Sequence, residues 1–401
     1  MNRMSGTRER FLVLRIKEEK TMVYKDFQGL KLSALGFGAM RLPVRDGDDS
    51  KPDREQVFKM VETAMKDGIN YYDTAWGYHD GNSELILAEA LSKYPRESYF
   101  LADKFPGYDL SNMPKVREIF EKQLEKTNAG YFDFYLFHNV CEMNIDHYLD
   151  PKYGIYEYLM EQKKNGRIRH LGFSCHGEID VLKRFLDAYG EDMEFCQLQL
   201  NYLDWKFQHG REKVDILRER NIPVWVMEPL RGGRLAKLNE TEENELKALR
   251  PGEEISAWAF RFLQSIPEVT LILSGMSDEA QLAANLKTFA EDRPLDEKEM
   301  SAIMSIADRM AEQKSVPCTA CRYCVSHCPQ GIDIPRMIEL YNEHLLTTSY
   351  GGMGFIAPMA MAAVPENKKP SACLHCRSCE RVCPQQIKIS EVMTDFVQKI
   401  G

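Results

Sequence analysis

The sequence of 401 residues has no long hydrophobic run and no excess of positive charge. Its apolar runs fall far short of the roughly 20 residues that a membrane-spanning helix needs, so we expect no membrane segment. Lys and Arg number 52 against 61 Asp and Glu, and the net charge of −9 argues against nucleic acid or an anionic membrane as a partner. A Gly-x-Gly-x-x-Gly motif after a strand is also absent, since only Gly36-x-Gly38 is found, so a Rossmann fold has no support.

A secretion signal is missing as well. Residues 1–21 lack the apolar core and the small-residue cleavage site of a signal peptide, and we predict that they are a flexible arm or a translated leader upstream of a start at Met22. The eleven cysteines are an odd number, which without a secretion signal favours a reducing, cytoplasmic compartment over a disulfide framework. Three cysteines are isolated and are expected to be small buried residues: Cys141, Cys175 and Cys196.

After a short hairpin that starts at Met22, apolar runs typical of strands alternate with amphipathic segments typical of helices. The predicted strands are residues 34–38, 69–73, 99–104, 132–138, 168–174, 195–201, 223–228 and 269–274. The predicted helices are residues 54–66, 83–93, 115–126, 155–164, 178–189, 212–220, 255–264 and 278–289. Strand–helix units of this number over about 270 residues predict a closed (β/α)₈ TIM barrel, with a doubly wound open sheet as the alternative.

A barrel would gather the C-terminal ends of its strands at one face, where active sites of this fold lie. Polar residues recur at those ends: Asp73, Lys104, His138, Ser174, Gln197 to Asn201, and Met227-Glu228. The simplest alternative is that Asp73 caps a turn and that Tyr78, five residues later, is a packing residue. An Asp, a Lys and a His at successive strand ends favour one shared site over independent caps and surface charges.

These residues, in this order, resemble the aldo-keto reductase family over nearly all of residues 22–290. The motifs that carry the resemblance are Asp73-Thr74-Ala75 with Tyr78 and Ser83-Glu84, Leu101-Ala102-Asp103-Lys104, Tyr135-Leu136-Phe137-His138, Leu171-Gly172-Phe173-Ser174, Gln197-x-x-x-Asn201 and Glu228-Pro229-Leu230. The resemblance implies a (β/α)₈ barrel and a nicotinamide cofactor bound without a Rossmann motif. It also implies a catalytic tetrad that consists of Asp73, Tyr78, Lys104 and His138.

The chemistry of these four side chains suits carbonyl reduction, which needs a hydride at carbon and a proton at oxygen. Tyr78 can donate the proton, and a cationic Lys104 beside it would lower the pKa of the phenol. Asp73 can pair with Lys104 and hold it in place, and His138 can orient the substrate oxygen. The expected substrate is therefore a small aldehyde, ketone or alcohol.

The resemblance also implies residues that hold the cofactor. Ser174 and Gln197 match positions that bind the nicotinamide carboxamide, and Met227 matches the position that stacks on the ring. The glycine-rich loop 229–234 suits a pyrophosphate through Pro229, Leu230, Arg231 and Gly233. Residues after the last strand complete the predicted set: Gly275, Ser277, Gln281 and Asn285. Asp278 stands where many family members have basic residues for the 2′-phosphate of NADP, so the choice between NADP(H) and NAD(H) stays open here.

Eight cysteines form two copies of one motif near the C-terminus. The first copy is Cys318-x₂-Cys321-x₂-Cys324-x₃-Cys328-Pro329, and the second is Cys373-x₂-Cys376-x₂-Cys379-x₃-Cys383-Pro384. In this spacing three thiolates bind one [4Fe–4S] cube and the fourth binds the other cube. Zinc is the alternative metal, but it favours paired Cys-x₂-Cys sets. We predict two [4Fe–4S] clusters, with ligand sets Cys318, Cys321, Cys324, Cys383 and Cys373, Cys376, Cys379, Cys328.

Each motif is followed by a predicted helix, at residues 335–345 and 390–399, and the long spacer resembles the helical two-cluster ferredoxin modules of respiratory iron–sulfur subunits. The apolar segment 350–363 is expected to pack this module onto the barrel or to form a lid. The predicted parts are thus residues 1–21, a barrel at 22–295 and a mainly helical ferredoxin-type domain at 296–401.

We therefore expect an NAD(P)(H)-dependent oxidoreductase with a two-cluster electron-transfer module. Hydride transfer moves two electrons at once whereas a cluster moves one, so a flavoprotein or ferredoxin is a possible redox partner. The alternative is a catalytically silent barrel in an iron–sulfur electron carrier.

Overall fold

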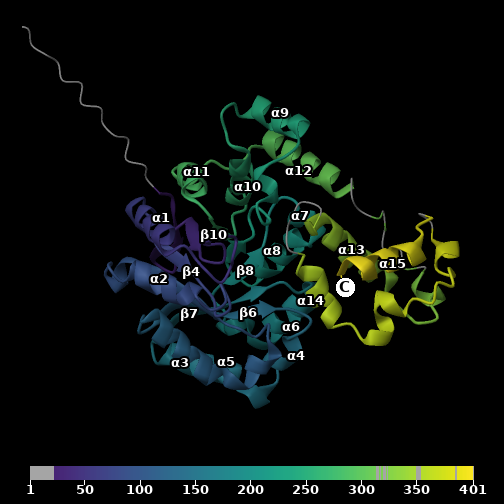
Figure 1. The fold of residues 1–401 in the computed structure, drawn as a ribbon, viewed down its shortest axis with the longest axis horizontal. Coiled ribbons are helices and arrows are strands. Elements are labelled where there is room, and N and C mark those ends of the chain that lie inside the picture. The colour runs from purple at the N-terminus through teal and green to yellow at the C-terminus, as the bar shows by residue number, and fades with distance from the viewer. Residues whose placement is uncertain are drawn as a thin grey trace, which may run out of the picture.

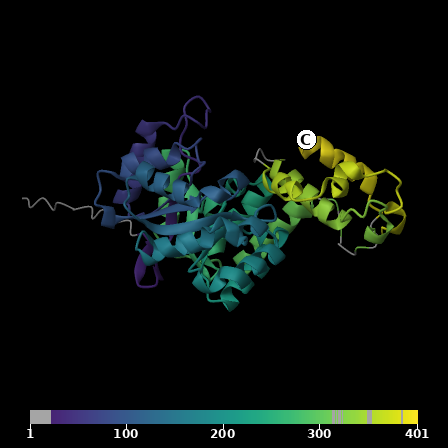
Figure 2. The ribbon, with the colours of Figure 1, turned by 90° about the horizontal axis from the view of Figure 1, so that it is seen from below.

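The computed structural model describes residues 22–312, 316, 318, 322, 324–348, 354–383 and 386–400. These residues form a barrel and a smaller helical lobe that projects from it (Figures 1 and 2). The predicted N-terminal arm and Cys321 lie outside the described residues. No helix among the described residues has both the length and the apolar character needed to cross a bilayer.

The barrel is closed by parallel strands in the order β10-β3-β4-β5-β6-β7-β8-β9. The strands are β3 (Leu35–Gly38), β4 (Tyr71–Asp73), β5 (Phe100–Phe105), β6 (Phe132–Val140), β7 (Ile168–Cys175), β8 (Cys196–Gln199), β9 (Val224–Met227) and β10 (Val269–Gly275). Each corresponds to one predicted apolar run, and pairing between β10 and β3 closes the sheet. The prediction of a barrel is confirmed, and the open doubly wound sheet is excluded.

Amphipathic helices surround the strands because their apolar positions recur on one face. The helices are α1 (Arg54–Lys66), α2 (Ser83–Leu91), α3 (Val116–Thr127), α5 (Ile155–Lys164), α6 (Ile179–Tyr189), α8 (Gly210–Glu219), α10 (Ile255–Gln264) and α11 (Glu279–Phe289). In α6, for example, the buried residues are Val181, Leu182, Phe185 and Leu186. Side-chain caps fix two of the starts: Asp53 accepts a hydrogen bond from the Gln56 amide before α1, and Asp278 accepts one from the Gln281 amide before α11.

A hairpin of β1 (Tyr24–Phe27) and β2 (Leu30–Ser33) packs into the interior of the barrel. The Phe27 ring contacts Trp225 edge-on, with centroids 4.9 Å apart, within an apolar cluster that also contains Phe134 and Phe195. Large side chains therefore fill this part of the barrel. Space for ligands is found instead at the C-terminal ends of the strands.

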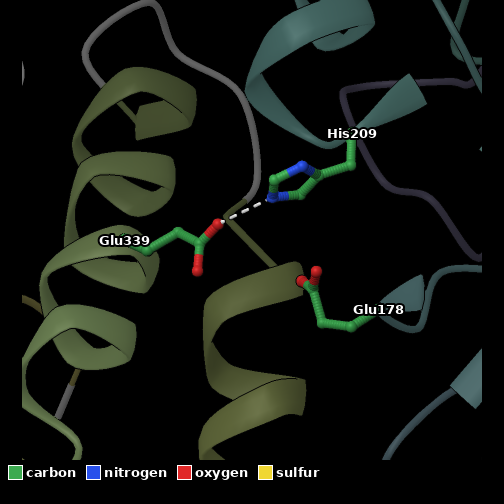
Figure 3. A group of neighbouring side chains, drawn as sticks. All are labelled: Glu178, His209 and Glu339. Atoms are coloured by element: carbon green, nitrogen blue, oxygen red, sulfur yellow. Dashed lines mark hydrogen bonds and ion pairs between the residues drawn. The ribbon is translucent and has the colours of Figure 1, made fainter. Parts of the chain in front are cut away.

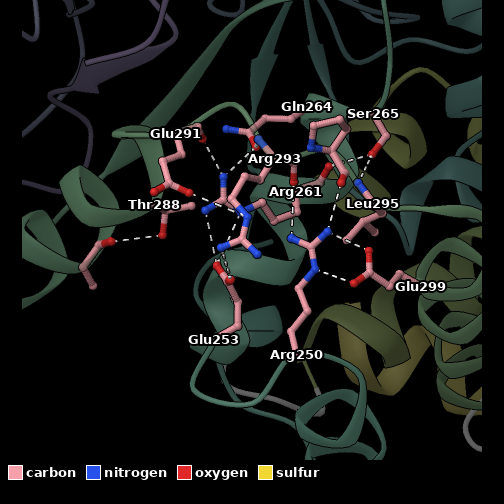
Figure 4. Close-up of polar contacts among 12 residues, drawn as sticks. Arg250, Glu253, Arg261, Gln264, Ser265, Thr288, Glu291, Arg293, Leu295 and Glu299 are labelled. Carbon is pink, nitrogen blue, oxygen red and sulfur yellow. Dashed lines mark hydrogen bonds and ion pairs between the residues drawn. The ribbon is translucent and has the colours of Figure 1, made fainter. Parts of the chain in front are cut away.

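Helix α12 (Glu297–Glu312) extends the barrel core, since Ile303 and Ile306 on its buried face belong to the barrel's hydrophobic cluster. Two arginines hold α12 and the chain segment before it (Figure 4). Arg250, at the end of α9 (Glu240–Leu249), contacts Glu299 in the first turn of α12 at 2.6 Å, and Arg261 donates to the carbonyl of Glu291, before the helix, at 2.6 Å. The sequence-based boundary at residue 295 would separate α12 from this core. We propose that the barrel domain extends through α12.

The second lobe contains α13 (Ile334–Thr348), α14 (Ile356–Ala362) and α15 (Ile389–Ile400). It has a hydrophobic core of its own, in which Ile338 on α13 and Met393 on α15 are buried. The Tyr341 and Phe396 rings meet edge-on at 5.4 Å. The two helices predicted after the cysteine motifs, α13 and α15, are confirmed.

Charged side chains join the lobe to the barrel (Figure 3). Arg336 on α13 contacts Glu178 of the barrel at 2.8 Å and Glu339 of its own helix at 2.9 Å, and His209 before α8 lies 3.4 Å from Glu339 and 3.7 Å from Glu212. We call Glu178, His209, Glu212 and Glu339 the His209 cluster. Because Arg336 already contacts two of its carboxylates, the cluster is an ion-pair network rather than a metal site.

Candidate active site

The strand ends bring the four predicted catalytic residues together. Asp73 ends β4, Lys104 lies near the end of β5, His138 lies in β6, and Tyr78 is in the loop after β4. Asp73, Tyr78 and His138 line one cavity of about 320 Å³, and Lys104 contacts Asp73 with none of its own side chain exposed. The geometry that the sequence predicted for this group is therefore present.

Lys104 is held by two oxygen atoms. Its Nζ donates to Asp73 Oδ1 at 2.6 Å and to the Thr74 carbonyl at 2.7 Å. Burial alone would lower the pKa of Lys104, but Asp73 and Tyr78 outweigh it and raise the pKa above its usual value, so the amine is cationic. Burial raises the pKa of Asp73, and Lys104 opposes that rise.

Tyr78 lies beside this cation, with its ring centroid 5.0 Å from Lys104 Nζ. Lys104 does lower the pKa of the phenol, as the sequence predicted, but burial has the larger effect and the net pKa lies above 10.0. The sequence could not indicate how deeply Tyr78 is buried, and burial outweighs the effect of Lys104 in the protein without ligand. Tyr78 is a neutral O–H donor at neutral pH, with a cation next to it that would stabilise the phenolate after proton loss.

His138 is enclosed by aromatic rings. Tyr78 and Tyr108 meet it edge-on at centroid distances of 6.0 and 5.2 Å. Burial lowers the pKa of His138 well below its usual range, and Lys104 and His176 lower it further, so the imidazole is neutral. Its Nδ1 has no hydrogen-bond partner among the described residues. Tyr108 and His176, which the sequence analysis missed, also line the cavity.

A buried polar network fixes β5 behind Lys104. Gln123 on α3 donates from Nε2 to Asp103 Oδ1 at 2.7 Å and to the Lys104 carbonyl at 3.0 Å. The same amide contacts Glu84 at 3.1 Å, and Glu84 pairs with Lys126. Burial and the charge of Glu84 raise the pKa of Asp103 well above its usual value. The network ties α2 and α3 to the strand that carries the amine.

A second cavity, of about 520 Å³, continues from the first, because Arg41, Glu228, Leu273 and Gly275 line both. The predicted cofactor residues that line it are Pro229, Leu230, Gly233, Gly275, Ser277, Gln281 and Asn285. Gln197 and Met227 line the first cavity, and the buried Gln197 Oε1 has no partner within the described part of the chain. A free amide oxygen at this place fits a carboxamide that donates to it.

Two predicted cofactor residues are placed differently. Ser174 is buried and lines neither cavity, and its Oγ accepts a hydrogen bond from the backbone N–H of Asn139 at 2.7 Å. Arg231 points away from the groove, because Asp204 on α7 (Asp204–Phe207) contacts its Nε at 3.1 Å and Glu343 on α13 contacts its Nη2 at 3.4 Å. We therefore leave Arg231 out of the proposed pyrophosphate contacts.

Arg41 supplies a cation to the groove in its place. It follows β3, the one strand end that the sequence analysis did not consider, and it pairs with Glu228 at 2.9 Å. Among the described residues, Arg41 is the one arginine or lysine that lines the larger cavity. Its position after a barrel strand is the feature of the sequence that could have identified it.

The cysteine motifs share the core of the second lobe. The buried Cys379 has Cys373 and Cys328 as neighbours. The pKa of Cys379 is raised to about 11, chiefly by burial, and these two sulfurs contribute to the rise. Cys328 of the first motif thus lies near the second motif, as crossed ligation requires. The Ile332 amide donates to Cys328 Sγ at 3.4 Å, which suits a thiolate ligand. The described thiols fit a cluster, while Cys321 lies outside the described residues.

Comparisons with known proteins agree with both lobes. The model of the aldo/keto reductase family matches residues 34–308, and that of a 4Fe-4S dicluster domain matches residues 317–387. The NADH-specific methylglyoxal reductase of Escherichia coli (strain K12) is 26% identical over 303 residues, which are 64% of this chain and 90% of that protein. The L-galactose dehydrogenase of Arabidopsis thaliana is 25% identical over 303 residues, covering 70% and 92%.

Solved structures share the barrel. The holo form of an aldo-keto reductase from Bacillus halodurans is 25% identical, with a TM-score of 0.57 over 71% of this chain and 96% of that chain. An aldo/keto reductase from Klebsiella pneumoniae in complex with NADP and acetate is 18% identical, with a TM-score of 0.57 over 72% and 95%, and shows the likeness of fold. Because the family model matches more than half of its length, this chain belongs to the aldo/keto reductase family, and it carries a 4Fe-4S dicluster domain C-terminal to the barrel.

Proposed function

We propose that the barrel interconverts a carbonyl and an alcohol by hydride transfer with NAD(P)(H), and that the second lobe carries two [4Fe–4S] clusters for electron transfer. One observation supports the barrel chemistry most strongly. The buried Lys104–Asp73 pair lies beside Tyr78, at a cavity that His138 also lines and that continues into a groove of about 520 Å³.

The nicotinamide supplies the hydride when it is bound, and the chain supplies the proton. Tyr78 donates its O–H to the carbonyl oxygen as negative charge develops there. Lys104 stabilises the phenolate that remains, and Asp73 keeps the amine charged and in place. In the reverse direction Tyr78 takes the proton back from the alcohol.

His138 orients the substrate oxygen. Because its imidazole is neutral, it offers one N–H donor without adding a second cation beside Lys104. The edge contacts with Tyr78 and Tyr108 restrict its ring to one orientation. A fixed donor of this kind favours the transition state, in which charge on the oxygen is greatest.

We propose NADH rather than NADPH as the preferred cofactor. Asp278 holds the start of α11 at the groove, accepting from the Gln281 amide at 2.8 Å and from Gln281 Nε2 at 2.9 Å. A carboxylate here would repel a 2′-phosphate. The one cation that lines the groove among the described residues, Arg41, is already paired with Glu228.

The second lobe has the donors for two clusters, which would carry single electrons to or from a flavoprotein or a ferredoxin. A silent barrel in an electron carrier remains the competing function, and the intact arrangement of Asp73, Lys104, Tyr78 and His138 favours the enzyme.

An anaerobic preparation separates the two functions. Iron and sulfide analysis should give eight of each per chain for two [4Fe–4S] clusters. NADH oxidation should then depend on an added aldehyde, for which methylglyoxal is a suitable first probe. Clusters without any nicotinamide turnover across a panel of aldehydes and ketones would reject the enzyme and favour the carrier.

A further inference from the structure

The iron–sulfur lobe reaches the reaction cavity. Phe355, directly before α14, lines the cavity together with Tyr78 and His138. It is the one residue from the described part of the second lobe that does so. Its ring meets that of His176, after β7, edge-on at 5.5 Å. One wall of the site is therefore built by a segment more than 170 residues away from the strand it faces.

A side chain of α14 itself also contacts a residue that lines the cavity. Met359, four residues after Phe355 and so on the same helical face, has its Sδ 3.3 Å from Asn139 Nδ2. Asn139 follows the catalytic histidine directly, and its buried Oδ1 has no partner among the described residues. The segment thus contacts β6, which carries His138, and His176, which directly follows β7.

The position of this segment is fixed by α13. Gly354 passes so close to α13 that a Cβ there would come within 2.9 Å of His344 Nδ1. Helix α13 is in turn joined to the barrel through Glu343, which contacts Arg231, and through Arg336, which contacts Glu178. Phe355 is therefore part of a wall that is held in place rather than a freely moving tip.

The cavity that Phe355 borders has a mainly apolar lining that includes a few unpaired polar atoms. His176 Nδ1 and Asn139 Oδ1 are buried without partners in the described chain, and Tyr108 lies opposite. Unpaired buried polar groups favour a ligand that can satisfy them. His176 Nδ1, in its N–H form, can donate to a ligand oxygen, and Asn139 Oδ1 can accept from a ligand hydroxyl. The Phe355 ring lines this cavity of about 320 Å³, so a substituent that extends toward it would meet the ring.

We propose that Phe355, supported by Met359, is the specificity-determining wall of the carbonyl pocket, which admits short carbonyl compounds with a second oxygen beside the carbonyl and excludes bulky substituents. This inference rests on the proposed carbonyl reduction. It assigns the iron–sulfur lobe a direct part in substrate selection, in addition to any electron transfer.

The test compares two 2-oxoaldehydes that differ in one substituent, methylglyoxal and phenylglyoxal, with the full-length holoenzyme. In Phe355→Ala, the ratio of kcat/KM for phenylglyoxal to kcat/KM for methylglyoxal should rise about tenfold or more. A change in pocket volume of this kind alters the discrimination between two substrates by about that factor. Phe355→Trp should lower the same ratio. Val397→Ala is the matched control, because this apolar side chain of the same lobe is 41% exposed and lies outside the cavity lining.

Iron content, measured on every variant, shows whether the lobe is intact. Ratios for Phe355→Ala and Phe355→Trp within about twofold of the wild-type ratio, with full iron, would overturn the specificity role while leaving carbonyl reduction standing. A wild-type protein that reduces neither aldehyde would instead refute the proposed function, and this inference with it.

Discussion

Replacing Lys104 with methionine tests the buried pair on which the active site depends. The side chains of Lys104 and Asp73 are 0% and 4% exposed, so removal of the amine leaves a carboxylate in the barrel without a cation. Breaking a buried pair in this way costs about 3–5 kcal/mol of unfolding free energy. Adding Asp73→Asn to Lys104→Met removes the unpaired carboxylate. The double variant should therefore recover about 2 kcal/mol or more of the lost unfolding free energy.

The pH dependence of this variant follows from Asp73. Burial already raises the pKa of this carboxyl, and loss of Lys104 removes the effect that opposes the rise. The folded variant then binds a proton more tightly than the unfolded chain does, so its stability should increase as the pH falls from neutral. Wild type should show a smaller gain, because Lys104 opposes the rise in the pKa of Asp73.

Urea unfolding followed by tryptophan fluorescence is a suitable assay. All four tryptophans lie in the barrel, so their signal is separate from the cluster absorbance of the second lobe. Lys93→Met is the matched control, because Lys93 pairs with Glu62 at 2.9 Å with both side chains about half exposed. That loss should be no more than about 1 kcal/mol. A Lys104→Met protein as stable as Lys93→Met would refute the buried pair.

Further predictions concern the lobe interface, the clusters and the cofactor. The pKa of His209 is raised above 6.5, chiefly by its hydrogen bond with Glu339 in the His209 cluster. The stability that the protonated imidazole adds to the folded protein is therefore fully present below pH 6.5 and is lost as the pH rises through the raised pKa. His209→Asn should abolish this pH dependence, which amounts to about 0.5 kcal/mol of unfolding free energy and can be followed by cluster absorbance. Asparagine tolerates the positive φ of 53° at this position, and an unaltered pH profile in this variant would contradict the role of His209. Cys379→Ser should lose the cluster bound by the second motif and about half of the iron, whereas full iron content would reject the ligand set. Removal of all iron with a chelator should lower the unfolding midpoint of the second lobe while the tryptophan transition of the barrel persists, and simultaneous loss of both would show that the barrel depends on the clusters. Asp278→Asn keeps a helix cap and should raise kcat/KM for NADPH relative to NADH about tenfold, and an unchanged ratio would exclude repulsion by this carboxylate.

The barrel and the meeting of Asp73, Tyr78, Lys104 and His138 at one face could be predicted because both depend on local patterns. Apolar runs of strand length end in Asp73, Lys104 and His138, and the topology of a closed parallel barrel places all strand ends at one face. Nothing more than the order of residues along the chain is needed for that inference.

The features that could not be predicted depend on contacts between segments that are far apart in the sequence. Arg231 lies in a glycine-rich loop that suited a phosphate, but Asp204 and Glu343, the latter 112 residues away, hold its guanidinium outside the groove. The pKa of Tyr78 depends on how deeply the barrel buries it, which outweighs the Lys104 charge. The apolar character of segment 350–363 predicted a contact with the barrel or a lid, and Phe355 and Met359 do contact the barrel. No local pattern indicated that Phe355 would line the cavity, because that depends on how the second lobe docks.

Transfer of deuterium from NADH labelled at the reactive C4 position tests the central claim most directly. If Tyr78, Lys104 and His138 act on a carbonyl beside the nicotinamide, the deuterium of the cofactor should appear on the carbinol carbon of the alcohol product, and Tyr78→Phe should slow its formation by about 10²-fold or more. A product whose carbinol hydrogen comes from solvent would contradict direct hydride transfer within the barrel.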